Sequence, residues 1–235
     1  MQHKTQDAVD ADNPLLQDWV LPNQAPPFDQ IREEHYLPAV EAAIAMAREN
    51  VDTIKNNKAA PDFENTVVAL EEASETLGIV SSVFYNQLSA AGTDGLHGLA
   101  EKIGPLSAAF SSDVLLDEKL FARVKDVYDT KEKLKLTAEQ ATLLDETYSG
   151  FVRGGALLDN AKKNRLREID RLTSVLGPTF MNNVTKSAEK FELYIDKESD
   201  LAGLPDSAKA GAAHEAEEKG RKGQWLFTLE YPSYG

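Results

Sequence analysis

Apolar side chains recur every three or four residues along almost the whole chain, and this spacing constrains the fold more than any other feature. It is typical of amphipathic helices that bury one face. The first long stretch of this kind contains Leu37, Val40, Ile44, Ala47, Val51 and Ile54. Because a proline is tolerated only in the first turn of a helix, we expect this helix to begin near Pro38.

Breaks in the pattern separate further helical stretches. Residues 63–88 form a second stretch after a break at residues 58–61, and residues 96–110 form a third with Pro105 as a kink or break. Shorter helices are predicted at 117–128 and at 137–151, where Thr137 and Gln140 have the spacing of a capping box.

A later helix is predicted from Asp159 to Leu176, with Gly177-Pro178 as its stop signal. We expect its inward face to contain Leu166, Ile169, Leu172 and Val175. A further segment covers residues 183–197, and an alanine-rich helix follows Pro205. Strand-like alternation of apolar and polar residues is found at Trp225, Phe227, Leu229 and Tyr231.

These stretches predict an all-α protein, an irregular multi-helix bundle of about seven or eight helices with a short strand-like C-terminal segment. Their uneven lengths and the lack of a fixed period argue against a repeat solenoid. We predict an extended N-terminal arm at residues 1–28, a helical domain at 29–223 and the strand-like segment at 224–235.

Charge and composition exclude several classes of function. The chain has 39 acidic and 25 basic residues, a formal net charge of −14, which repels nucleic acid and anionic membrane surfaces. It contains no cysteine, so a disulfide framework, a thiolate metal site and a cysteine nucleophile are excluded. No apolar run is long enough to cross a bilayer, and we expect a soluble protein of the cytoplasm or the periplasm.

The sequence offers weak candidates for metal binding. A zinc peptidase needs two histidines one helical turn apart with a glutamate between them, as in H-E-x-x-H. In the nearest string Glu218 stands where the second histidine after His214 belongs, so the pair makes half a site and is interpreted as a solvated helix face. His35, beside two glutamates, is interpreted as a structural hydrogen-bonding residue at a helix entry; His3 and His97 are expected at the surface.

Charged clusters give two further candidates for chemistry. The acidic groups Glu71-Glu72-Glu75 and Glu215-Glu217-Glu218 could be paired carboxylates, but we interpret both as solvated faces. The basic run at residues 162–167 is interpreted as pairing with Glu168 and Asp170 along a helix surface. No nucleophile or nucleotide motif is found, and we assign no catalytic, cofactor-binding or metal residue.

Several motifs, in order, resemble one peptidase family. They are Pro26-Pro27-Phe28-Asp29-Gln30-Ile31, Glu34-His35-Tyr36-Leu37-Pro38-Ala39, Phe63-Glu64-Asn65-Thr66 with Ala69-Leu70-Glu71, Asp200-Leu201-Ala202-Gly203-Leu204-Pro205, and Trp225-Leu226-Phe227-Thr228-Leu229 with Pro232-Ser233-Tyr234. Together they resemble the opening third of the thimet-oligopeptidase (M3) family of zinc metallopeptidases, most closely its bacterial peptidyl-dipeptidases and oligopeptidases.

The resemblance implies a non-catalytic N-terminal region that forms one wall of a channel for short peptides. It implies that one zinc and the H-E-x-x-H helix lie in a C-terminal region beyond Gly235, which would be this region's partner. The chain alone is then expected to be inactive and to hold no zinc. The alternative is a stand-alone helical interaction module without enzymatic activity.

The C-terminal segment carries a separate expectation. A strand with one apolar face is marginal unless it is paired and covered. We therefore expect residues 224–235 to be disordered, folded back on the chain's own helices, or paired with a second copy as a homodimer.

Overall fold

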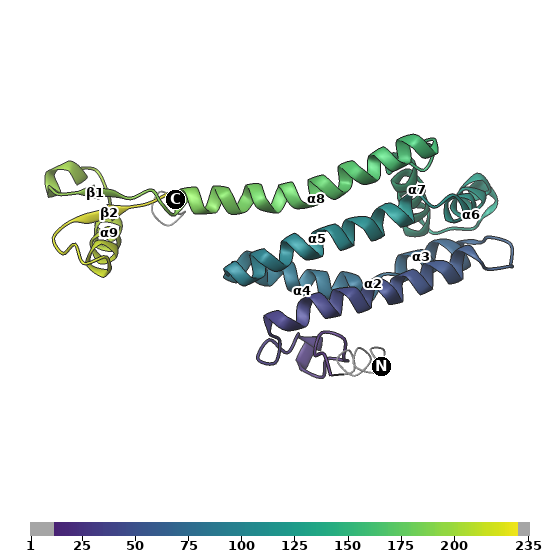
Figure 1. Ribbon diagram of the computed structural model, residues 1–235, viewed down its shortest axis with the longest axis horizontal. Coiled ribbons are helices and arrows are strands. Elements are labelled where there is room, and N and C mark those ends of the chain that lie inside the picture. The colour runs from purple at the N-terminus through teal and green to yellow at the C-terminus, as the bar shows by residue number, and fades with distance from the viewer. Residues whose placement is uncertain (1–11, 230–235) are drawn as a thin grey trace. The chain divides into compact units, whose positions relative to one another are not determined.

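The computed structural model describes residues 12–229 and consists of helices with one small two-stranded sheet (Figure 1). The predicted all-α class is confirmed. The chain divides into two compact units, Met1–Pro178 and Thr179–Gly235, which are described separately. The helix α8 (Asn160–Ala188) begins in the first unit and ends in the second.

Three long helices form the main core of the first unit. The helix α2 (Glu33–Lys55) packs against α4 (Glu75–Ala91) and α5 (Asp94–Leu115), as Figure 1 shows. The stripe predicted for α2 is confirmed, because its members from Val40 to Ile54 are buried and Leu37 packs against the core. Tyr36 and Phe84 meet edge to face in this core, with ring centroids 5.2 Å apart.

A second layer of packing joins the shorter elements at one end of the unit. The π-helix η2 (Phe63–Val68) leads into α3 (Ala69–Glu72) and lies near α6 (Glu118–Asp129) and α7 (Ala138–Arg153). Ala69 and Leu70 of α3 pack against the buried cluster that contains Phe121 and Phe151. The predicted capping box of α7 is confirmed, since the Gln140 amide N–H donates to the Thr137 hydroxyl at 3.2 Å. Buried Phe121 and Phe151 rings stack in this layer.

The N-terminal arm is anchored to the helices where it is described. Leu15 is buried in the main core and Trp19 packs beside it. The Asn13 amide donates to the carbonyl of His35 at 2.9 Å, which ties the arm to the first turn of α2. A 3-10 turn, η1 (Pro22–Gln24), lies between this anchor and α2.

Two predicted helix breaks are absent. The helix α5 continues through Pro105, and α8 continues through Gly177-Pro178, so the predicted stop was wrong. A proline leaves the carbonyl four residues earlier without its helical donor, which for Pro178 is the carbonyl of Ser174. That carbonyl lies against Gly104 of α5, where a Cβ would come within 3.0 Å of it.

The predicted inward face of α8 was wrong in part. Leu166 and Val175 are partly buried, but Ile169 is 40% exposed and Leu172 47% exposed. Conversely, the stretch predicted at 63–88 is divided at Ala73 and Ser74, between α3 and α4. Helical periodicity identifies an apolar face but not which neighbour covers it.

The second unit is built on a small sheet. The strand β1 (Leu193–Ile195) pairs antiparallel with β2 (Trp225–Phe227), with Tyr194 opposite Leu226. Between them lie the 3-10 turn η4 (Glu198–Leu201) and α9 (Asp206–Glu218), which packs on β2. The predicted segment at 183–197 is therefore the end of α8 followed by β1, a strand that periodicity missed because it is three residues long.

Of the three outcomes expected for the C-terminal segment, folding back onto the same chain is found for residues 225–227. Leu226 is 1% exposed there. Residues 230–235, including Tyr231, lie outside the described residues.

Candidate functional site

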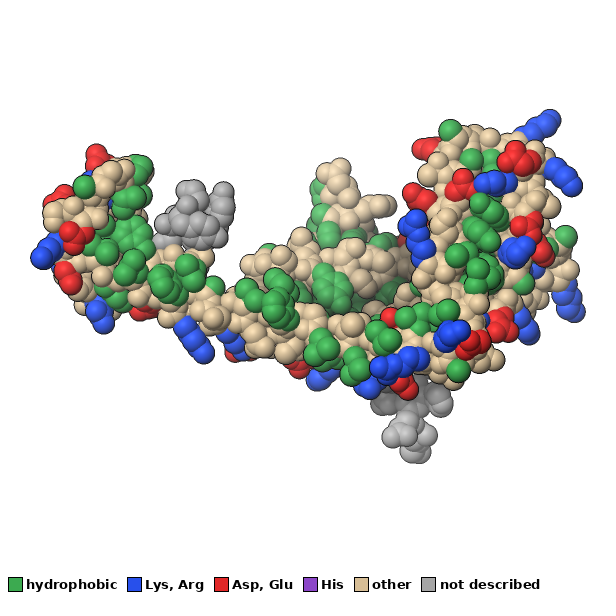
Figure 2. Space-filling view, turned by 90° about the horizontal axis from the view of Figure 1, so that it is seen from above, with side chains coloured by type: hydrophobic (Ala, Val, Ile, Leu, Met, Phe, Trp, Pro, Cys, Tyr) green, Lys and Arg blue, Asp and Glu red, His purple; other side chains and the backbone are tan. Residues whose placement is uncertain are grey.

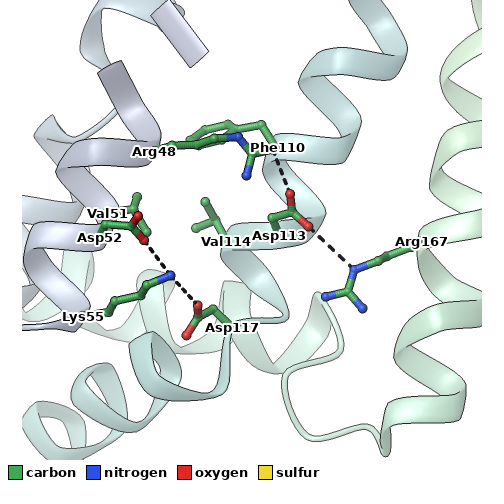
Figure 3. Close-up of a pocket in the computed structure, with 9 residues that line it drawn as sticks. All are labelled: Arg48, Val51, Asp52, Lys55, Phe110, Asp113, Val114, Asp117 and Arg167. Carbon is green, nitrogen blue, oxygen red and sulfur yellow. Dashed lines mark hydrogen bonds and ion pairs between the residues drawn. The ribbon is translucent and has the colours of Figure 1, made fainter. Parts of the chain in front are cut away.

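A charged pocket lies between α2, α5 and α8 in the first unit. It has about 400 Å³ of open volume, and Val51, Phe110 and Val114 are the apolar residues that line it. Six charged side chains also line the pocket (Figure 3): Arg48, Asp52, Lys55, Asp113, Asp117 and Arg167. Sequence analysis had singled out Arg167 in the basic run at residues 162–167, but it did not place the six residues in one site.

Lys55 occupies the centre of one half of the pocket. Its ammonium lies 2.7 Å from Asp52 Oδ1 and 3.2 Å from Asp117 Oδ2. The hydrogen bond that the Lys55 ammonium donates to the Asp52 carboxylate is the main cause that raises the pKa of Lys55, and Asp117 adds to it. Lys55 is therefore held in its charged form between two carboxylates (Figure 3).

Asp117 also caps a helix. Burial by itself raises the pKa of its carboxyl, but the Leu120 amide and the Lys55 ammonium outweigh this and hold the pKa below its ordinary value. The carboxylate accepts from the amides of Lys119 and Leu120, both at 2.9 Å, at the start of α6. One carboxylate thus joins the end of α2 to the first turn of α6.

Asp113 occupies the other half and bridges two arginines. Arg48 Nη2 donates to Asp113 Oδ2 at 2.8 Å, and Arg167 Nε lies 3.8 Å from Asp113 Oδ1. The Arg48 guanidinium also lies over the Phe110 ring at 5.6 Å from its centroid. These contacts join α2, α5 and α8 (Figure 3).

Three cations and three carboxylates leave this pocket without net charge, and each of the six has an opposite charge as a partner. It contains no histidine, serine or threonine that could serve as base or nucleophile. The ion pairs of the pocket therefore fix helices relative to one another.

A second pocket of about 300 Å³ adjoins the first through Val51, Phe110 and Val114. Glu71 and Glu146 line it, but Glu72 and Glu75 do not. Glu71, Glu72 and Glu75 are all exposed. The cluster therefore does not converge on one pocket, which agrees with the prediction of a solvated face.

The histidines do not gather either. The ring of His35 accepts from the Arg32 amide through Nδ1 at 3.0 Å, which confirms its structural role at the entry of α2. His214 and Glu218 are exposed on α9 with 3.6 Å between Nε2 and Oε1. His97 is partly buried in the first turn of α5, and His3 lies outside the described residues.

The basic run differs partly from its interpretation. Arg165 pairs with Glu168 at 2.8 Å, as predicted, but Asp170 accepts instead from the Ser112 hydroxyl at 2.7 Å. Lys163 is buried, with its ammonium 3.2 Å from Glu118 Oε1 and 3.3 Å from the carbonyl of Leu116. Nothing in a run of basic residues indicates which of them is buried.

Within residues 12–229, no group of three or more histidine or acidic side chains is placed to hold a metal ion. Over the same residues, no helix is both long and apolar enough to span a membrane. The described part of the chain is thus a helical body with polar cross-links between its helices. Figure 2 shows acidic and basic side chains intermixed over the end that carries α6 and α7.

Comparison with known proteins shows that the chain is similar to bacterial peptidases. No model of a known protein family matches the chain. The dipeptidyl carboxypeptidase of Salmonella typhimurium is 36% identical over 217 residues, which are 92% of this chain and 32% of that protein. Oligopeptidase A of Escherichia coli is 33% identical over 222 residues, 94% of this chain and 32% of that protein.

The chain is therefore a relative of bacterial peptidases of the thimet-oligopeptidase (M3) family, and it corresponds to their N-terminal third. It spans about a third of the length of the curated relatives it matches. The resemblance noted from the sequence motifs is confirmed.

Proposed function

We propose that this chain is the N-terminal, non-catalytic region of a zinc-dependent oligopeptidase or peptidyl-dipeptidase, where it forms one wall of a channel for short peptides. The observation that carries the proposal is the match of 92% of the chain to 32% of a dipeptidyl carboxypeptidase. The zinc and its ligands would come from the region that corresponds to the other two-thirds of the relatives.

The packing and the ion pairs between the long helices support a wall-forming role. The long helices α2, α4 and α5 share one core, and charged pairs fix α2 to α5 and α6. A wall that limits the size of an entering peptide needs such fixed helices, because a yielding wall would admit larger substrates.

Reconstitution tests the proposal. A separately expressed C-terminal region should be poorly soluble or weakly active alone and should gain peptidase activity when this chain is added. This chain alone should hydrolyse no peptide and retain no stoichiometric zinc after dialysis. Substrates of increasing length provide the control, because only a complete channel discriminates by size.

The alternative, a stand-alone interaction module, predicts a different result. Full activity and unchanged size selectivity of the C-terminal region without this chain would exclude the wall role. One tightly held zinc per chain, or chelator-sensitive cleavage by this chain alone, would exclude its non-catalytic character.

A further inference from the structure

The helix α8 has an unusual distribution of burial for its length. It runs from Asn160 to Ala188, and its single buried residue is Lys163. Large apolar side chains on the same helix are exposed: Ile169 at 40%, Leu172 at 47% and Leu176 at 62%. A helix on the surface of a globular protein normally shows the opposite arrangement.

Polar groups fix α8 to the rest of the first unit. Asp170 accepts from Ser112, Lys163 reaches the carbonyl of Leu116, and Arg167 lies near Asp113. A gap of about 490 Å³, lined by residues such as Ser111 and Leu166, remains between α5 and α8. The contacts that hold α8 to the first unit are therefore largely polar, with Leu166 as a partly buried apolar residue among them.

The exposed apolar residues share one face of α8. Ile169, Leu172 and Leu176 are separated by three and four residues, which places them in one row. The same spacing continues in the sequence at Phe180 and Val184, in the part of α8 that belongs to the second unit, and both are exposed. Figure 2 shows hydrophobic side chains recurring along α8.

We propose that the row Ile169, Leu172 and Leu176, called here the α8 face, is the docking surface for the region of the protein that follows this chain. This inference rests on the proposed function. The curated relatives are about three times as long as the matched segment, so under the proposed function a large partner lies within the same protein. Exposed apolar rows of this kind mark interaction surfaces.

A second copy of the chain is a poorer occupant. Each chain has a formal net charge of −14, and two copies with that charge repel one another. The same charge disfavours an anionic membrane surface. A region of the same polypeptide does not have to overcome this repulsion between two separate chains. The peptide chain itself holds it close to the α8 face at a high effective concentration.

Cysteine accessibility tests the proposal, because the chain has no cysteine of its own. Leu172→Cys is introduced into this chain and into the full-length protein that contains it, and thiol labelling rates are compared. We expect fast labelling in this chain and labelling roughly tenfold slower or more in the full-length protein. Ile169→Cys is a second reporter in case the first variant folds poorly.

Arg171→Cys is the matched control on the same helix. Arg171 is exposed next to Leu172 in sequence but projects from a different side of α8. It should label rapidly in both proteins. Uniform slowing at Arg171 and Leu172 would indicate general shielding and would overturn the assignment of one docking face.

The outcomes separate this inference from the proposed function. Fast labelling of Leu172→Cys in a full-length protein that cleaves peptides would overturn the proposed docking face, while the proposed function would still stand. Protection in a full-length protein without peptidase activity supports the docking face and refutes the function. Concentration-dependent protection in this chain alone would assign the face to a second copy, against the proposal.

Discussion

A single buried guanidinium joins α6 to the loop that precedes η2. Arg123 is 7% exposed and donates through Nη1 to the carbonyls of Asn57 and Ala59, and through Nη2 to Asn65 and Thr66. These acceptors are neutral, so the charge is stabilised by dipoles. The four contacts together fix the loop between α2 and η2, which has little apolar packing of its own.

Replacing Arg123 should therefore destabilise the first unit. We expect Arg123→Met to lower the free energy of unfolding by about 3 kcal/mol, because buried carbonyls lose a charged donor. Arg165→Met is the control, since Arg165 is exposed and its pair with Glu168 contributes at most about 1 kcal/mol. Urea unfolding of both variants measures the difference; equal small losses would contradict the role given to Arg123.

Asp117 gives the protein a defined acid dependence. Its folded pKa lies below the ordinary value, so its stabilising contribution is present above the unfolded pKa of about 3.9 and is lost as the pH falls through the folded pKa. We expect Asp117→Asn to reduce the loss of stability, relative to the parent, between about pH 6, where carboxyl groups are ionised, and the acid range.

The choice of asparagine isolates the charge of Asp117. Asparagine caps helices about as well as aspartate, so the contacts to the first turn of α6 are retained while the ion pair with Lys55 is lost. Unfolding by urea at several pH values gives the result. Parallel pH profiles for the variant and the parent would show that Asp117 does not cause the acid loss.

At the scale of one element, the end of α7 depends on a glycine in left-handed conformation. Gly155 has a φ of 98°, and the amides of Gly155 and Ala156 donate to the carbonyls of Val152 and Phe151. This is a Schellman ending, in which the left-handed residue is usually glycine. A Cβ on Gly155 would also lie 2.8 Å from a methyl carbon of Leu166.

Two alanine substitutions in the same region should have opposite effects. We expect Gly155→Ala to destabilise by about 2–4 kcal/mol through backbone strain and crowding. Gly150→Ala, inside α7 with no atom within 4 Å of the new Cβ, should stabilise by about 0.5–1 kcal/mol. Thermal or urea unfolding distinguishes them, and a shift of the same sign in both would contradict this account.

Periodicity was sufficient to predict most of the helices but not all of their neighbours. The stripe of α2 and the capping box of α7 were predicted because each depends on residues close in sequence. The outward face of α8 was not, because the side on which a helix packs is decided by elements far away in sequence. Nor does the sequence indicate that the Ser174 carbonyl, which Pro178 leaves without its helical donor, lies against Gly104 of α5.

The charged pocket could not be predicted for the same reason. Asp52 and Lys55 are three residues apart and could have been paired from sequence, but Asp117 is 62 residues beyond Lys55. No composition rule indicates such a pair. By contrast, the hydrogen bond of His35 could be predicted, because its partner, the Arg32 amide, is three residues away at the same helix entry.

At the scale of the whole molecule, the two units differ in the size of their cores. Among the described residues, the first unit contains three clusters of buried apolar side chains. In the second unit the buried apolar residues that the structure describes are Leu201, Ala212, Ala216 and Leu226. Two of these are alanines, which bury little area, and small cores give marginal stability.

We therefore expect the second unit to unfold at lower urea concentration than the first. The chain has two tryptophans, and each unit contains one of them: Trp19 packs on the main core, and Trp225 lies in β2. In a Trp225→Phe variant the fluorescence reports the first unit, and in a Trp19→Phe variant it reports the second. The Trp225 signal should change first, because fewer buried contacts oppose opening there.

Truncation after Gly223 provides an independent check of the same expectation. It removes β2 and with it Leu226 and the partner of β1, so amide protection should disappear from β1 and α9. Protection in α2, α4 and α5 should persist, because their core contains no residue of the second unit. Coincident transitions of the two tryptophans, or loss of protection in α2 on truncation, would show that the units unfold as one.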